Sequence, residues 1–300
     1  MGTVVNIQVV RTADQALDRL APDAIERAMN WFRTVESSCN RFDPSSEVRQ
    51  LSRQIGVAVP VSAILFEAVQ FALAVAEESD GAFDPTVGVA MEEHGFDREY
   101  QSGASTASGV RERGTVKYRD VGLDVDARTI TLQKPLLLDL SAVAKGLAID
   151  LAARELASYG HFAVDAGGDL YAAGLNPHAR PWSVGIRHPR ETDQCIEIVQ
   201  LSNAAMCTSG DYERRRPADD GGHHILDART RESPAAVASA TVIARSAMVA
   251  DALATAAFVL GPADGVQLLE RSGVMGVMFT PGLERFSTTG MAGAAIFPNA

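Results

Sequence analysis

An apolar segment late in the chain carries two polar residues at a helical spacing. Residues 247–260 read AMVADALATAAFVL, and only Asp251 and Thr255 are polar. A helix that is apolar on all sides is normally buried, and residues four apart project from one face. A buried carboxylate needs a cation or a proton, and an aspartate with a hydroxyl suits Mg²⁺ when positions remain for ligand oxygens and water. The alternative is a core aspartate that caps a nearby loop, with Thr255 bonded to its own helix backbone.

A second candidate segment, residues 136–152, reads LLLDLSAVAKGLAIDLA. The pattern predicts a buried strand over 136–140 that ends near Asp139, and a helix that begins after Ser141. Small residues in the first helical turn, followed by Lys145, would let an anion approach backbone N–H groups and a positive charge. The alternative is an ordinary serine cap with Lys145 in solvent.

Three shorter motifs could also present groups to a ligand. The turn at 81–86, GAFDPT, could offer a ring and a carboxylate, although such a segment is often only a turn. Residues 165–169, DAGGD, place a glycine pair between two strands, which also suits a hairpin turn and is not the GxGxxG of a dinucleotide site. His223 and His224 are expected on a strand, where neighbouring side chains point to opposite faces, and one of them could be a general base.

Composition and charge limit the classes of function. The chain has 300 residues, of which 46% are hydrophobic and 22% are charged, which is an ordinary globular composition. A net charge of −11 argues against nucleic acid as a partner, because counterion release would contribute little to binding. Cys39, Cys195 and Cys207 are far apart and form no CxxC pair, which argues against a zinc or dithiol site.

Neither an export signal nor a membrane span is visible in the sequence. The first residues, MGTVVNIQVV, lack the basic region and the long apolar region of a signal peptide. No run of about 18 apolar residues occurs, so no transmembrane segment is expected. We therefore expect a cytoplasmic protein, or an exported one if an N-terminal signal was removed.

Hydrophobic periodicity predicts an α+β fold, because the expected strands are grouped rather than alternating strictly with helices. The expected helices cover 22–38, a short segment ending at Leu51, 62–78, 142–159, 247–260 and 263–272. The expected strands cover 3–10, 121–125, 128–133, 136–140, 162–166, 169–173, 182–187, 195–201, 239–244, 274–279 and 285–287. Ser62 is the expected N-cap of its helix, and Gly160 and Gly261 are expected to end theirs.

Together, the motifs resemble those of the ApbE family, the FAD:protein FMN transferases. The matching segments cover nearly the whole chain in the order of the family. They are Met1-Gly2-Thr3, Ser45-Ser46-Glu47 after Phe42, GAFDPTVG at 81–88, DLSAVAKG at 139–146, DAGGDLYAAG at 165–174, WSVGIRHP at 182–189, TSGDYER at 208–214, HHILDART at 223–230 and ADALAT at 250–255.

The resemblance implies an ApbE-like α+β fold of mixed or antiparallel sheets with packed helices. It implies a single domain over residues 1–300, with two structural lobes as the alternative. The implied activity is Mg²⁺-dependent cleavage of FAD, with FMN attached through a phosphoester to a threonine or serine of an acceptor flavoprotein of electron transport and AMP released. Two alternatives stay open: a Mg²⁺-dependent FAD pyrophosphatase giving FMN and AMP, and a non-enzymatic FAD-binding protein.

The resemblance also assigns roles to particular residues. Asp251 and Thr255 match metal ligands of the family, joined by the backbone carbonyl of Ala142. His224 matches the proposed base, which would take the proton of the attacking hydroxyl. The positions that contact FAD fall on Met1, Phe42, Ala82, Phe83, Asp84, Asp139, Lys145 and Ile225. Phe42 stands where the family often has a tyrosine, which implies ring stacking without a hydroxyl contact.

Overall fold

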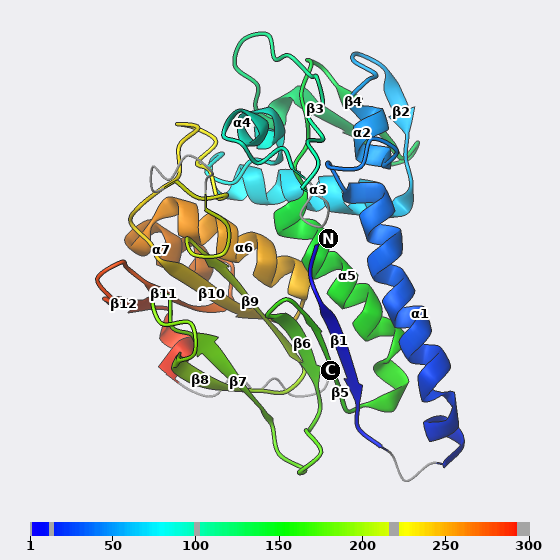
Figure 1. The fold of residues 1–300 in the computed structure, drawn as a ribbon, viewed down its shortest axis with the longest axis vertical. Helices are drawn as coiled ribbons and strands as arrows, with labels where there is room; N and C mark the ends of the chain where they lie inside the picture. The colour runs from blue at the N-terminus through cyan, green and yellow to red at the C-terminus, as the bar shows by residue number, and fades with distance from the viewer. Residues whose placement is uncertain (1, 12–14, 99–102, 216–221, 293–300) are drawn as a thin grey trace. The chain divides into compact units, whose positions relative to one another are not determined.

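The computed structural model describes residues 2–11, 15–98, 103–215 and 222–292, which form two compact units (Figure 1). Unit 1 comprises Met1–Gly2, Thr34–Ala144 and Glu213–Pro234, and unit 2 comprises Thr3–Arg33, Lys145–Tyr212 and Ala235–Ala300. Two helices, α1 (Gln15–Cys39) and α5 (Ser141–Glu155), each include residues of both units. Met1, an expected FAD contact, lies outside the described residues.

An antiparallel sheet of seven strands forms the centre of unit 2. From one edge to the other the strands are β1 (Val5–Val9), β5 (Phe162–Ala166), β6 (Asp169–Ala173), β9 (Ala204–Gly210), β10 (Ser239–Ala244), β11 (Met275–Phe279) and β12 (Arg285–Ser287). Each pair of neighbours is antiparallel. All residues of β10 are buried, as expected of a central strand that is covered on both faces.

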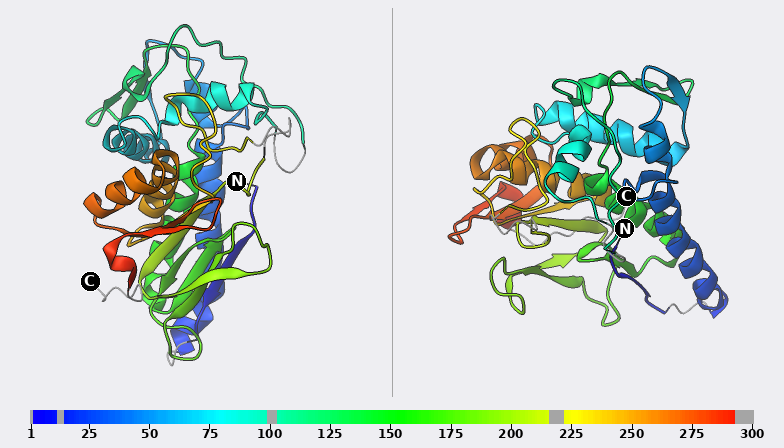
Figure 2. Two further views of the ribbon diagram at one scale, coloured as in Figure 1. Left: turned by 90° about the vertical axis from the view of Figure 1, so that its left-hand side faces the viewer. Right: turned by 45° about the horizontal axis from the view of Figure 1, so that its top comes forward.

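Helices cover one face of this sheet. The helix α6 (Ala247–Leu260) packs on β9 and β10, and α7 (Pro262–Arg271) packs on α6 and β11. Figures 1 and 2 show both helices over the half of the sheet that contains β9, β10 and β11. A short 3₁₀ turn at Thr289–Ala292 follows β12.

A β-hairpin covers the other face of the same half. Its strands are β7 (Trp182–Arg187) and β8 (Cys195–Leu201), and it buries Ile186 and Val199 against Met206 of β9. Cys207, the next residue of β9, instead points its thiol at the carbonyl of Ala247 in α6. Neighbouring strand residues point to opposite faces, so α6 and the hairpin lie on opposite sides of β9.

The predicted buried helix at 247–260 is confirmed by α6. Ser246 is its N-cap, with the side-chain oxygen accepting from the backbone N–H of Val249, and Gly261 follows its last residue with a φ of 85°. Residues on every side of α6 are buried, including Asp251 and Phe258. The apolar sequence therefore reflects contact with the sheet on one side and with α7 on another.

Unit 1 contains a smaller antiparallel sheet with short helices. Its strands, in spatial order, are β2 (Ala58–Pro60), β4 (Thr129–Leu132) and β3 (Val121–Asp124). The helices are α2 (Glu47–Leu51), α3 (Ala63–Glu78) and α4 (Gly88–Glu93), with 3₁₀ turns at Pro85–Val87 and Tyr118–Asp120. The predicted cap of α3 is confirmed, because Ser62 Oγ accepts from the N–H of Leu65 at 3.1 Å.

Two predicted strands are wrong. The segment 136–140 is buried but pairs with the turn at 85–88 instead of with a strand. The N–H of Asp139 donates to the carbonyl of Pro85 at 2.7 Å, and the N–H of Gly88 donates to that of Leu137 at 3.1 Å. At His223 and His224, the described residues form only an isolated bridge between Arg215 and His223.

Other differences concern element boundaries and small residues. The strands β2 and β9 and the helix α4 were not predicted, and α1 begins at Gln15 instead of residue 22. The helix predicted to reach residue 159 ends at Glu155, and a 3₁₀ turn at Ala157–Tyr159 leads to Gly160 with a φ of 70°. The α+β fold class is confirmed. Among the described helices, none combines the length and the apolar character that crossing a membrane requires.

Candidate active site

Two charged residues of unit 2, Lys145 and Asp169, influence the expected metal ligand Asp251 electrostatically. Asp251 is only 5% exposed, and its Oδ2 accepts from the backbone N–H of Gly146 at 3.1 Å. Lys145, beside Gly146 in α5, forms an ion pair with Asp169 at 2.5 Å between Nζ and Oδ2. The other oxygen of Asp169 accepts from the N–H of Thr208 at 2.9 Å. The two aspartates are buried, whereas the side chain of Lys145 is 29% exposed.

The electrostatics of this group favour a proton or a cation at Asp251. Burial raises the pKa of Asp251, the ammonium of Lys145 opposes that shift, and the carboxylate of Asp169 adds to it. For Lys145, burial alone would lower the pKa, but Asp169 and Asp251 outweigh it and raise the pKa above its ordinary value. Lys145 therefore stays protonated and pairs with Asp169, whereas the metal-free Asp251 tends to hold a proton. A bound cation would take the place of that proton.

The donor atoms beside Asp251 fit a hard cation such as Mg²⁺. Thr255 lies one helical turn after Asp251, and its Oγ1 is 3.0 Å from Oγ of Ser209 on β9. In the part of the chain that the structure describes, no group of three or more His, Cys, Asp and Glu side chains could hold a metal. Any cation here would thus depend on hydroxyl and carbonyl oxygens and on a ligand's own oxygens. Mg²⁺ commonly binds through one or two carboxylates together with substrate phosphates and water.

The expected carbonyl ligand, Ala142, lies one turn before Gly146 in α5. In a regular helix the N–H of Gly146 would donate to this carbonyl. That N–H also donates to Oδ2 of Asp251. The role of the Ala142 carbonyl as a metal ligand stays a prediction.

In unit 1, the expected FAD contacts Phe42 and Asp139 share a buried arginine. The guanidinium of Arg41 pairs with Asp139 at 2.6 Å, donates to the carbonyl of Phe96 at 2.8 Å, and lies 4.0 Å from the centroid of the Phe42 ring. Ser141 donates to Asp139 Oδ1 through both its N–H and its hydroxyl. Burial alone would raise the pKa of Asp139, but Arg41 and Ser141 outweigh it and lower the pKa. Asp139 is therefore a carboxylate with a fixed orientation.

Replacing Arg41 with alanine is expected to destabilise the protein by about 3–5 kcal/mol, because Asp139 would remain buried without its cation. Chemical denaturation at pH 7 measures this loss. Arg119→Ala is the control, because it removes an exposed ion pair with Glu77, and it should leave the free energy of unfolding nearly unchanged. Equal losses in the two variants would contradict the role of Arg41.

The pH dependence of the Arg41 variant provides a second check. The pKa of Asp139 is lowered in the folded protein, so this pair stabilises the fold above the ordinary pKa of about 3.9. The contribution is lost as the pH falls through the folded-state pKa. The difference between wild type and Arg41→Ala should therefore shrink in acid.

The turn at 81–86 buries the three expected FAD contacts that it carries. Ala82 and Phe83 are buried. Asp84 Oδ1 accepts from the N–H and the hydroxyl of Thr86, and Oδ2 accepts from the N–H of Tyr118 at 2.8 Å. Burial raises the pKa of Asp84 although these bonds oppose it. Asp84 thus holds this turn together, and its contact with FAD stays a prediction.

The neighbouring histidines of unit 1 have different surroundings. His223 is buried; its Nδ1 accepts from the N–H of Ile225 at 3.3 Å, and its Nε2 lies 2.9 Å from the carbonyl of Pro234. Both ring nitrogens thus face backbone groups, which gives His223 a structural role. His224 is half-buried, and its backbone N–H donates to the carbonyl of Arg214. The role of His224 as the base stays a prediction.

The predicted residues are divided between the two units. Lys145, Asp251 and Thr255 belong to unit 2, whereas the other described candidates belong to unit 1. Two charged residues that were not predicted from the sequence pair with predicted ones: Asp169 with Lys145, and Arg41 with Asp139. Asp169 ends the DAGGD motif and Arg41 precedes Phe42, so each lies in or beside a segment that carries predicted residues.

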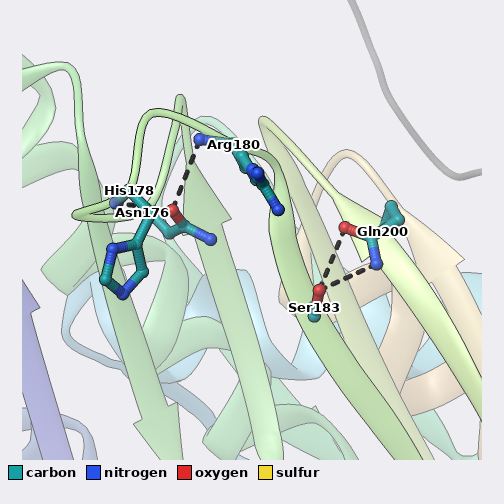
Figure 3. A pocket seen from close by; sticks show the side chains of 5 residues that line it. All are labelled: Asn176, His178, Arg180, Ser183 and Gln200. Atoms are coloured by element: carbon teal, nitrogen blue, oxygen red, sulfur yellow. Dashed lines mark hydrogen bonds between the residues drawn. The ribbon is translucent and has the colours of Figure 1, made fainter.

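A surface pocket of unit 2 contains none of the predicted residues. It is lined by Asn176, His178, Arg180, Ser183 and Gln200 (Figure 3). Asn176 Oδ1 accepts from the N–H groups of His178 and Arg180, and Ser183 bonds to Gln200. None of the residues predicted for the metal, the base or the FAD contacts lines this pocket.

Comparison with known proteins identifies the family. The family model described as the ApbE family matches residues 1–279. The chain belongs to the ApbE family. Among solved structures, the ApbE protein of Thermotoga maritima is 29% identical with a TM-score of 0.80, and 97% of each chain is covered. The flavin transferase ApbE from Vibrio cholerae is 25% identical with a TM-score of 0.81, covering 97% of this chain and 96% of that one. The expected ApbE-like fold is therefore confirmed.

Curated relatives in the ApbE family share one name. The chain is 28% identical over 287 residues to the FAD:protein FMN transferase of Haemophilus influenzae, covering 91% of this chain and 82% of that protein. It is 35% identical over 263 residues to the FAD:protein FMN transferase of Treponema pallidum, covering 79% of this chain and 71% of that protein. These relatives confirm the expected enzyme class, a transferase.

Proposed function

We propose that this ApbE-family chain is a Mg²⁺-dependent FAD:protein FMN transferase. It cleaves the pyrophosphate of FAD, attaches FMN through a phosphoester to a threonine or serine of an acceptor flavoprotein of electron transport, and releases AMP. The names of the relatives support the reaction class. The observation that carries the proposal for this chain is the buried carboxylate of Asp251, which lies one helical turn before Thr255 and accepts from the N–H of Gly146, the neighbour of Lys145.

The metal-binding residues are Asp251, Thr255 and the backbone carbonyl of Ala142. Bound Mg²⁺ supplies positive charge to the phosphate oxygens of FAD as negative charge develops there. Lys145 adds a second positive charge, held in place by Asp169, which is itself fixed by the N–H of Thr208. An acidic protein needs such local positive charge to bind a pyrophosphate.

Residues of the family motifs are the proposed contacts with the remainder of FAD. Phe42 offers a ring for stacking, and Arg41 and Asp139 fix the polar groups beside it. The other proposed FAD contacts are Met1, Ala82, Phe83, Asp84, Lys145 and Ile225.

The transfer step forms one phosphorus–oxygen bond and breaks another. The acceptor hydroxyl oxygen forms a bond to the phosphorus of the FMN half, and the bond from that phosphorus to the bridging oxygen breaks. That oxygen leaves with AMP, and His224 takes the proton of the attacking hydroxyl. The acceptor thus carries FMN as a phosphodiester between its hydroxyl and riboflavin.

Incubation of the purified protein with FAD and Mg²⁺, with AMP resolved by chromatography, tests the metal-dependent cleavage. We expect AMP to accumulate in the presence of an acceptor and to stop when EDTA is added. FAD that binds and stays intact with Mg²⁺ and acceptor present would overturn the proposal and favour a non-enzymatic FAD-binding protein.

A further inference from the structure

The first turn of α6 is capped by a carboxylate from another helix. Asp150 of α5 accepts from the hydroxyl of Ser246 at 2.6 Å, from the N–H of Ala247 at 2.7 Å and from the N–H of Met248 at 3.0 Å. The hydroxyl oxygen of Ser246 accepts in turn from the N–H of Val249. Three N–H groups that a helix start leaves without helical partners are therefore satisfied, two of them by α5.

The backbones of α5 and α6 also touch at Gly146, one turn before Asp150. A Cβ atom at Gly146 would lie 2.4 Å from the carbonyl oxygen of Ala247 and 2.5 Å from the Cα of Met248. No side chain fits between such closely packed backbones. The N–H of Gly146 meanwhile donates to Asp251. The helix α5 therefore contacts the first turn of α6 through Asp150 and its second turn through Gly146.

Three residues of α6 at a spacing of four form the stripe next to this contact. Each of the three takes part in a hydrogen bond: Ala247 with Asp150, Asp251 with Gly146, and Thr255 with Ser209. Because a helix is stiff over two turns, fixing its first turn fixes where the later side chains of the stripe project. Loss of the contact at Asp150 would let the start of α6 move away from α5.

We propose that Asp150 is a positioning residue for the metal site, which acts by holding the first turn of α6 so that Asp251 and Thr255 present their oxygens to one cation. This inference rests on the proposed function, because it assumes that these two residues bind the metal. Ser246 already caps the helix locally, so a carboxylate was not needed merely to start it. What Asp150 adds is the link between the two helices.

The Asp150→Asn variant tests this role, since asparagine keeps the size of the side chain but replaces one acceptor oxygen with an NH₂ group that cannot accept. Mn²⁺, monitored by the EPR signal of the free ion, serves as the probe for metal binding without FAD. Changes of partners behind metal ligands typically cost 10–100-fold in affinity, so we expect the Mn²⁺ dissociation constant to rise about tenfold. The Mg²⁺ concentration that half-saturates AMP release should rise by a similar factor, with the rate at saturating Mg²⁺ kept within about threefold.

A matched control exists on α3, where Glu47 bonds to the N-cap Ser62. Its Oε1 accepts from the N–H of Ser62 and its Oε2 accepts from the hydroxyl, each at 2.5 Å. Glu47→Gln disturbs the same kind of helix cap in unit 1, and it should leave the Mn²⁺ dissociation constant unchanged. An unchanged constant in Asp150→Asn, or an equal rise in Glu47→Gln, would overturn the positioning role.

Mn²⁺ binding tests this inference, and AMP release tests the proposed function, so the failure of one can be told from the failure of the other. Wild-type protein that binds Mn²⁺ without releasing AMP would overturn the transferase activity, and a tenfold weaker binding in Asp150→Asn would still support the positioning role. Wild-type protein that binds no Mn²⁺ would overturn the inference itself.

Discussion

Replacement of Asp251 by asparagine is expected to lower the rate of FAD cleavage on the order of 10³-fold, the upper range for loss of one group that stabilises developing charge. Asparagine can still accept the bond from Gly146, but it brings no negative charge to hold a cation beside Lys145. Initial rates of AMP release at saturating FAD, over a Mg²⁺ titration, measure the effect. The surface variant Asp264→Asn on α7 is the control and should keep the wild-type rate.

The Asp251→Asn variant should also differ from the metal-free wild type in how its stability depends on pH. Burial raises the pKa of Asp251 in the folded protein, so the metal-free fold binds a proton that the unfolded chain releases. The metal-free wild type should therefore lose stability as the pH rises above about 4 toward the folded-state pKa. Asp251→Asn should lack this loss and unfold at an equal or higher temperature at pH 7 in EDTA. A less stable variant at every pH would show that Asp251 supports the fold instead of the metal.

Replacement of His224 by alanine is expected to lower the rate of FMN transfer by about 10²–10⁴-fold, the usual contribution of a positioned general base. The loss arises because the acceptor hydroxyl must attack without a group that takes its proton. Transfer to an acceptor peptide at saturating FAD and Mg²⁺ measures the rate, and Mn²⁺ binding should stay unchanged. Full activity in this variant would refute the assignment of the base.

The neighbouring His223 offers a control with the opposite outcome. Its ring links the N–H of Ile225 to the carbonyl of Pro234 inside unit 1. His223→Ala should therefore lower the unfolding temperature more than His224→Ala does. The reverse pattern, with stability lost at His224 and activity lost at His223, would exchange the two roles.

The elements that were predictable from sequence are those whose own residues determine their structure. The helix α6 is apolar on all sides, begins after a serine and ends before a glycine, so its burial and both ends follow from local chemistry. The strand β9 was missed because its residues, AAMCTSG, have little strand propensity. It is a strand because β6 and β10 pair with it, which depends on contacts between distant segments.

In the candidate site, too, contacts between distant segments could not be predicted from the sequence. Spacing alone predicted that Asp251 and Thr255 share a face, because helical geometry fixes that relation. The partners Asp169 and Asp150 could not be assigned, since the first reaches Lys145 from β6 and the second reaches Ser246 from α5. Likewise, segment 136–140 has the apolar run of a strand, yet its backbone bonds to the turn at 85–88. Periodicity reports burial, but it does not identify the partner.

The intact mass of an acceptor flavoprotein, measured after incubation with this protein, FAD and Mg²⁺, tests the central claim most directly. The account predicts that the acceptor gains the mass of one FMN, less water, on a threonine or serine, with one AMP released for each FMN attached. It also predicts no gain with EDTA or with Asp251→Asn. An acceptor of unchanged mass beside free FMN and AMP would contradict the transferase and identify a pyrophosphatase.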